Sequence, residues 1–150
     1  MRQVILFLAS GGGAGYIPFA PGTWGSAVGL LAYWLLLRLP QWPLAVTVAA
    51  FVFLSCWIAG LAEEFLAAKD PQVIVIDEVS GMLVALMFLP ASWRVVLAAF
   101  VLFRLFDVWK PFPVRWIQEN LPGGWGVVGD DIMAGIYANL VLQIALRAIR

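Results

Sequence analysis

The stretch from Trp42 to Ala62 constrains the fold of this chain more than any other, because it contains no charged residue over 21 positions. At about 1.5 Å per residue, a helix of this length crosses the roughly 30 Å hydrocarbon core of a bilayer. The composition agrees, since 63% of the residues are hydrophobic and the mean hydropathy is +0.95. The sequence therefore predicts a membrane protein with a single helical domain, residues 1–150.

Two scarce residue types exclude whole classes of chemistry. The chain has no histidine, which removes histidine nucleophiles, histidine metal ligands and the usual proton shuttle near neutral pH. Its single cysteine, Cys56, lies inside the charge-free stretch, so no disulfide or thiolate metal cluster can form within the chain. Nine basic and nine acidic residues balance to a formal charge of zero, which argues against a nucleic-acid partner.

The acidic residues occupy only one part of the chain. All nine fall between residues 63 and 131, and the first 62 residues contain none. In so apolar a chain, this segregation predicts one polar face joined to a hydrophobic bundle. The nine are Glu63, Glu64, Asp70, Asp77, Glu78, Asp107, Glu119, Asp130 and Asp131.

Two pairs of acids stand where a helix is expected to begin. Asp130 and Asp131 follow a glycine-rich segment and precede the apolar run from Ile132 to Leu146. Asp77 and Glu78 likewise precede an apolar run, which ends at Leu89. Acids at these positions either cap the helix and favour its positive end, or hold a cation. The residues alone leave both interpretations open.

A third segment points to anion binding. Glycines and prolines from Ser10 to Gly25 predict a loop, and the apolar segment that follows extends through Leu37. Thr23 or Ser26 can cap a helix there, and the free N–H groups of such a helix end attract phosphate. A capped helix with a flexible lead-in explains the same residues without any ligand.

Polar residues also interrupt two later apolar segments. Arg104, Asp107 and Lys110 recur every three residues and would lie near one another on a helix. They form either simple ion pairs or part of a functional site. Ionisable groups at the end of an apolar helix are costly unless they serve a site, so we favour the second interpretation. Asn139 and Gln143 lie one turn apart in the last helix, where they are expected to hydrogen-bond inside the bundle.

Four motifs occur in a fixed order along the chain. They are PGTWGS at 21–26, DEVSG at 77–81, FRLFDVWKPFPVRW at 103–116 and GGWGVVGDDIMAG at 123–135. Together they resemble the bacterial phosphatidylglycerophosphatase A family. The resemblance implies an all-α, polytopic membrane bundle. Because the acidic motifs lie at the ends of apolar segments, we also expect the acidic site to form at helix ends on one membrane face. The resemblance also implies removal of the terminal phosphate of phosphatidylglycerophosphate, with Mg²⁺, in the bacterial cytoplasmic membrane, with the site facing the cytoplasm.

The available side chains suit this implied chemistry, because Mg²⁺ prefers oxygen ligands. The candidate metal ligands are Asp77, Glu78, Asp107, Asp130 and Asp131, of which Asp77, Asp107 and Asp131 are the expected catalytic residues. The candidate phosphate-binding residues are Thr23, Ser26, Arg104 and Lys110.

Two other functions remain as alternatives. A membrane CDP-alcohol phosphotransferase also gathers aspartates around Mg²⁺, but its long aspartate and glycine pattern is absent from this chain. A non-enzymatic membrane scaffold would explain the apolar segments, but it would not require Asp107 beside Arg104 and Lys110.

Overall fold

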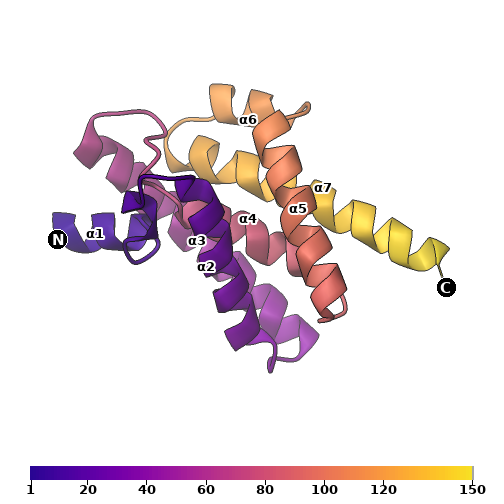
Figure 1. Ribbon diagram of the computed structural model, residues 1–150. Helices are drawn as coiled ribbons and strands as arrows, with labels where there is room; N and C mark the ends of the chain where they lie inside the picture. The colour runs from indigo at the N-terminus through magenta and orange to yellow at the C-terminus, as the bar shows by residue number, and fades with distance from the viewer. Residues whose placement is uncertain (150) are drawn as a thin grey trace.

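A computed structural model describes residues 1–149, and within them it contains helices and no strands (Figure 1). This confirms the all-α fold class. The elements are α1 (Arg2–Ala9), the 3-10 helix η1 (Ala14–Tyr16), α2 (Pro21–Leu36), α3 (Gln41–Leu66), α4 (Ile76–Leu86), α5 (Trp93–Trp109), α6 (Val114–Asn120) and α7 (Gly124–Ala148).

Two helices are long and apolar enough to cross a bilayer. They are α3, with 26 residues, and α7, with 25 residues. The charge-free stretch from Trp42 to Ala62 lies within α3, and α7 packs beside it. Helices α4 and α5 have 11 and 17 residues, so neither reaches the length of the other two.

Helix α4 forms the centre of the bundle and contacts α2, α3, α5 and α7. It is apolar on nearly all sides after its first turn, as expected for a helix surrounded by others. Small residues let its neighbours approach closely. A Cβ atom at Gly29 would lie only 2.7 Å from the Met82 Cβ, and one at Gly135 would overlap the Gly81 carbonyl. The bundle therefore depends on near backbone contact around α4.

Helix α2 begins earlier than the glycine and proline content of its first turns suggests. The expected loop ends before Pro21, which occupies the first turn of α2, where a missing N–H costs little. Ala20 is the N-cap and no side chain caps the helix, so the expectation that Thr23 or Ser26 caps it is wrong. The Ser26 hydroxyl instead donates to the Gly22 carbonyl of its own helix at 2.9 Å.

Helix α7 also begins earlier, at Gly124, so Asp130 and Asp131 lie in its second turn and not at its entrance. Glycine normally disfavours a helix, but a Cβ at position 124 would overlap the Cys56 carbonyl of α3. Tertiary packing therefore requires glycine where propensity would choose another residue. In α4 the N-cap is Val75, again without a side-chain cap. Helix capping thus explains neither pair of acids.

Candidate active site

Five carboxylates from three helices meet at one end of the bundle. Asp77 and Glu78 lie in the first turn of α4, and Asp107 lies in the last turn of α5. Asp130 and Asp131 are supplied by α7. One oxygen each from Asp77, Glu78 and Asp131 lie within 4.8 Å of one another, as do oxygens from Asp107, Asp130 and Asp131. Asp131 belongs to both groups and so lies between them.

These carboxylates line a cavity of about 260 Å³. The N-terminal end of α2 closes one side through Ala20, Pro21 and Gly22. A Cβ atom at Gly22 would overlap a Glu78 oxygen and lie 2.9 Å from the nearest Arg104 guanidinium nitrogen. Any larger residue at this position would displace the Glu78 and Arg104 side chains from the cavity. The other lining residues are Asp70, Gln72, Ile74, Asp77, Glu78, Arg104, Asp107, Lys110, Asp130 and Asp131.

Several of these carboxylates are buried without the partners that buried charge requires. Asp77, Asp130 and Asp131 are 6%, 3% and 3% exposed. Among the described residues, Asp77 Oδ1 and Glu78 Oε2 are buried and have no hydrogen-bond partner. An unsatisfied buried carboxylate oxygen is costly, and a cation would satisfy it. The all-oxygen donor set fits a hard divalent cation, and the acidic cluster could therefore bind a metal ion.

The electrostatics of the first turn of α4 agree with this interpretation. Burial raises the pKa of Asp77 well above its usual value, and the negative charge of Glu78 raises it further. Burial likewise raises the pKa of Glu78, with Asp107 adding to the effect and Arg104 opposing it. The protein alone therefore disfavours the charged form of both acids. A bound cation would favour that form.

Two basic side chains compensate part of the negative charge. Arg104 lies 2.6 Å from Asp107 Oδ2 and 4.0 Å from Glu78 Oε1. Lys110 Nζ donates to Asp130 Oδ2 and lies 3.9 Å from Asp107 Oδ1. Burial lowers the pKa of Lys110, but the negative charges of Asp130 and Asp107 outweigh it, so the net shift is upward. Arg104 and Lys110 thus lie at the cavity wall, where each has further N–H groups for an anion.

The predicted site residues differ in where the structure places them. The five acids, Arg104 and Lys110 all line the cavity. Thr23 is exposed and Ser26 is fully buried, and neither lines it.

Six lining residues were not among the predicted site residues: Ala20, Pro21, Gly22, Asp70, Gln72 and Ile74. Asp70 accepts a hydrogen bond from Gln118 of α6, and its own N–H donates to Glu63 Oε1 at 2.7 Å. Its only signal in the sequence was its place in a helix-breaking Lys-Asp-Pro segment.

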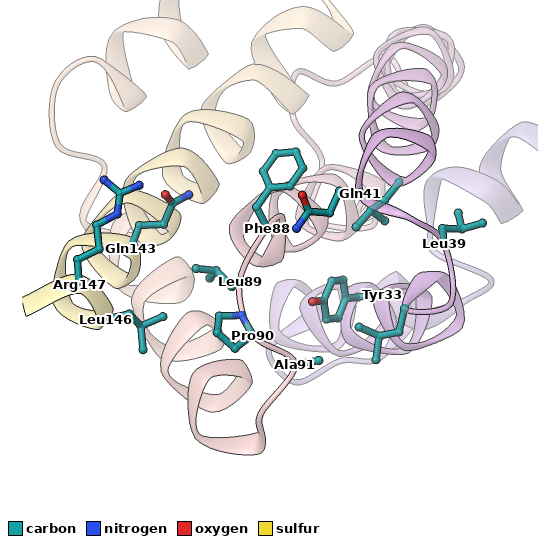
Figure 2. A pocket seen from close by; sticks show the side chains of 12 residues that line it. Tyr33, Leu39, Gln41, Phe88, Leu89, Pro90, Ala91, Gln143, Leu146 and Arg147 are labelled. Atoms are coloured by element: carbon teal, nitrogen blue, oxygen red, sulfur yellow. The ribbon is translucent and has the colours of Figure 1, made fainter. Parts of the chain in front are cut away.

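A second cavity, of about 460 Å³, lies where the C-terminal parts of α2 and α7 meet the segment after α4 (Figure 2). Its polar side chains include Gln143 and Arg147 of α7 and Gln41 of α3. None of the acidic residues among positions 1–149 lines it. This larger cavity thus lacks the carboxylates that could hold a divalent cation, whereas the acidic cavity contains them.

The protein is an all-helical bundle with two candidate membrane spans. It contains a buried cluster of carboxylates beside two cationic side chains. These features define a class of apolar proteins with a site suited to a metal ion and phosphate. A family model described as "PgpA: Phosphatidylglycerophosphatase A" matches residues 7–146. The chain belongs to the phosphatidylglycerophosphatase A family, which is a family of phosphatases.

Individual relatives agree over nearly the whole chain. The phosphatidylglycerophosphatase A of Haemophilus influenzae is 41% identical, over 92% of this chain and 86% of its own. That of Escherichia coli is 37% identical, over 90% of this chain and 79% of its own. A Bacteroides thetaiotaomicron protein, provisionally named a phosphatidylinositol-3-phosphatase, is 38% identical, over 93% and 92%. No solved structure matches this chain.

Proposed function

We propose that this protein is a Mg²⁺-dependent phosphatase that hydrolyses the terminal phosphomonoester of phosphatidylglycerophosphate to give phosphatidylglycerol. The observation that carries the proposal is the acidic cavity, where buried oxygens of Asp77 and Glu78 have no partner among the described residues while Arg104 and Lys110 stand beside them. The names of the Haemophilus influenzae and Escherichia coli relatives support this substrate.

The carboxylates of the cavity would hold the metal. The two groups that can do so are Asp77, Glu78 and Asp131, and Asp107, Asp130 and Asp131. When bound, Mg²⁺ offsets charge on the phosphoryl oxygens and lowers the pKa of water. Asp131 is common to both groups, which makes it the ligand whose loss should matter most.

The basic residues would bind the phosphate. Arg104 is oriented by its 2.6 Å contact with Asp107, and Lys110 is oriented by Asp130. The remaining N–H groups of both can donate to phosphate oxygens and stabilise the charge that shifts between them during transfer.

Proton transfer during hydrolysis would also be carried out by carboxylates, because the chain has no histidine. In the hydrolysis, a water oxygen bonds to phosphorus as the bond to the glycerol oxygen breaks, and a proton must reach that glycerol oxygen. Asp77, which lines the cavity, is suited by its position to accept a proton from the water and pass it to the glycerol oxygen.

Phosphate release from defined lipids would test the proposal. Purified protein in detergent micelles would receive phosphatidylglycerophosphate, phosphatidylinositol 3-phosphate or phosphatidic acid, each with Mg²⁺ or with EDTA. We expect phosphate release from phosphatidylglycerophosphate with Mg²⁺ and none with EDTA. Preference for the inositol lipid would instead favour the activity for which the Bacteroides relative is named. No release from any of them would favour a scaffold.

We further propose that α3 and α7 span the bacterial cytoplasmic membrane and that the acidic site faces the cytoplasm. The length and composition of both helices support the spans. A cysteine introduced at exposed Asn120, the last residue of α6, in a Cys56→Ala background would report the orientation, because Gln118 of the same helix contacts Asp70 of the cavity. A membrane-impermeant thiol reagent should label it in inverted vesicles and not in intact cells. The reverse pattern would place the site outside.

A further inference from the structure

A second recess adjoins the acidic cavity on the outside of the bundle. It has a volume of about 570 Å³ and lies between the C-terminal end of α5 and helix α6, which are neighbours at one end of the molecule (Figure 1). Lys110 lines both spaces, so the two meet at this side chain. We call this recess the α6 groove. Its lining residues are Trp109, Lys110, Pro111, Phe112, Arg115, Trp116 and Glu119.

The α6 groove contains a cation that the site described above does not use. Arg115 is exposed and forms no ion pair with any residue between positions 1 and 149. Arg104 and Lys110, by contrast, are both engaged with carboxylates. One acid, Glu119, also lines the groove. A guanidinium without a partner presents several N–H donors in a planar fork, a geometry that suits phosphate oxygens.

Exposed aromatic rings surround this guanidinium. Trp109, Phe112 and Trp116 are 64%, 80% and 51% exposed, although they are large and apolar. In a helical membrane protein, aromatic rings at helix ends lie at the level of the lipid headgroups. Rings and guanidinium together therefore fit a ligand that is both anionic and anchored in the bilayer.

We propose that the α6 groove binds the phosphodiester of an anionic glycerophospholipid, with Arg115 as its main ligand. The inference rests on the proposed function and specifies how its substrate is held. Phosphatidylglycerophosphate carries two phosphate groups joined by one glycerol, a monoester and an inner diester. The acidic cavity takes the monoester, the α6 groove takes the diester, and Lys110 stands between them. Arg115 thus selects lipids that carry the inner diester.

The test uses a lipid that has the diester but no monoester, so that it reports on the groove alone. Equilibrium binding of soluble dihexanoyl-phosphatidylglycerol to detergent-solubilised protein would be measured by calorimetry. Wild type would be compared with Arg115→Gln, with Arg115→Lys and with the matched control Arg38→Gln. Arg38 is likewise an exposed arginine beside a tryptophan, Trp34, but it follows the C-terminal end of α2, away from the acidic cavity.

We expect Arg115→Gln to raise the Kd for this lipid about tenfold, the order expected for one lost hydrogen bond to a charged group. Arg115→Lys should raise the Kd less, because lysine keeps the positive charge but lacks the planar set of N–H donors of the guanidinium. Arg38→Gln should bind like wild type. Inorganic phosphate should inhibit the hydrolysis of phosphatidylglycerophosphate by wild type and by Arg115→Gln equally, because it occupies the acidic cavity and not the groove.

Three results would overturn the inference: no binding of the lipid by wild type, an unchanged Kd in Arg115→Gln, or equal losses in Arg115→Gln and Arg38→Gln. Circular dichroism of each variant would show whether it is folded, and Arg115→Lys replaces Arg115→Gln if the latter is not. Failure of the proposed function would look different, because wild type would then release no phosphate whatever the binding result.

Discussion

Lys110, at the C-cap of α5, donates a hydrogen bond to Asp130 in the second turn of α7 and so joins two helices across the acidic cavity. Asp130 is only 3% exposed, so its charge depends on this partner. Lys110→Met should lower the free energy of unfolding by on the order of 3 kcal/mol in EDTA, because it leaves a buried carboxylate unpaired. The double variant with Asp130→Asn should recover much of the loss. Thermal unfolding of the Lys110→Met variant and of the double variant would be compared with that of wild type. Equal losses of unfolding free energy in the two variants would mean that Lys110 and Asp130 are not coupled.

Asp131→Asn should abolish activity without unfolding the protein. The substitution keeps the shape of the side chain but removes the charge from the one acid that both candidate metal groups share. We expect phosphate release to fall about 100-fold or more, equivalent to roughly 2.7 kcal/mol of transition-state stabilisation. Exposed Glu64 lies outside the cavity, so Glu64→Gln serves as the control and should remain active. Near-full activity of Asp131→Asn at limiting Mg²⁺ would remove Asp131 from the ligand set.

Mg²⁺ should stabilise the folded protein. A ligand that binds only the native state adds about 2.7 kcal/mol at a hundred times its Kd, so the melting temperature should rise with Mg²⁺ concentration. The buried oxygens of Asp77 and Glu78 that lack partners are the structural reason. Differential scanning fluorimetry from EDTA to millimolar Mg²⁺ would measure the shift. A melting temperature that does not change with Mg²⁺ in wild type, or that shifts equally in Asp131→Asn, would contradict it.

Alanine substitutions at two glycines on different helices should have different effects, one mainly on activity and the other mainly on stability. A methyl group at Gly22 meets side-chain atoms of Glu78 and Arg104, whereas one at Gly135 meets the backbone carbonyl of Gly81. Side chains can move and backbone cannot do so cheaply. Gly22→Ala should therefore reduce activity with little change in melting temperature, and Gly135→Ala should lower the melting temperature first. Assays of both properties on both variants would expose a reversed pattern.

Asn139 should matter for stability and not for chemistry. Its amide donates to the backbone oxygens of Ala85 at 3.0 Å and Met87 at 2.7 Å, and its own oxygen accepts from Gln143 at 2.6 Å. This confirms the expected hydrogen bonding inside the bundle. Asn139→Leu should cost about 0.6 to 2 kcal/mol, the range found for hydrogen bonds between membrane helices, and leave the Mg²⁺ requirement unchanged. An altered Mg²⁺ dependence would instead connect α7 packing to the site.

Much of the architecture follows from the sequence by itself. A stretch without charges from Trp42 to Ala62 can hardly be anything but a long apolar helix, and the structure places it within α3. The acids of the cavity could be selected as well, because an ionisable group beside an apolar run is costly unless it has a purpose. These properties depend on residue type and on order along the chain.

Other features were decided only by tertiary packing. Glycines before Asp130 indicate a loop, yet Gly124 begins a helix because only glycine fits against the Cys56 carbonyl. The Lys-Asp-Pro segment marks Asp70 only as part of a helix break, and it lines the cavity in the fold, where its side chain accepts a hydrogen bond from Gln118 of α6. Thr23 looks like a phosphate ligand in the sequence, but the start of α2 at Pro21 leaves it exposed and outside the cavity lining. Local sequence specifies the helices and the available chemical groups, whereas helix ends and the set of groups that meet depend on contacts between segments far apart in the chain.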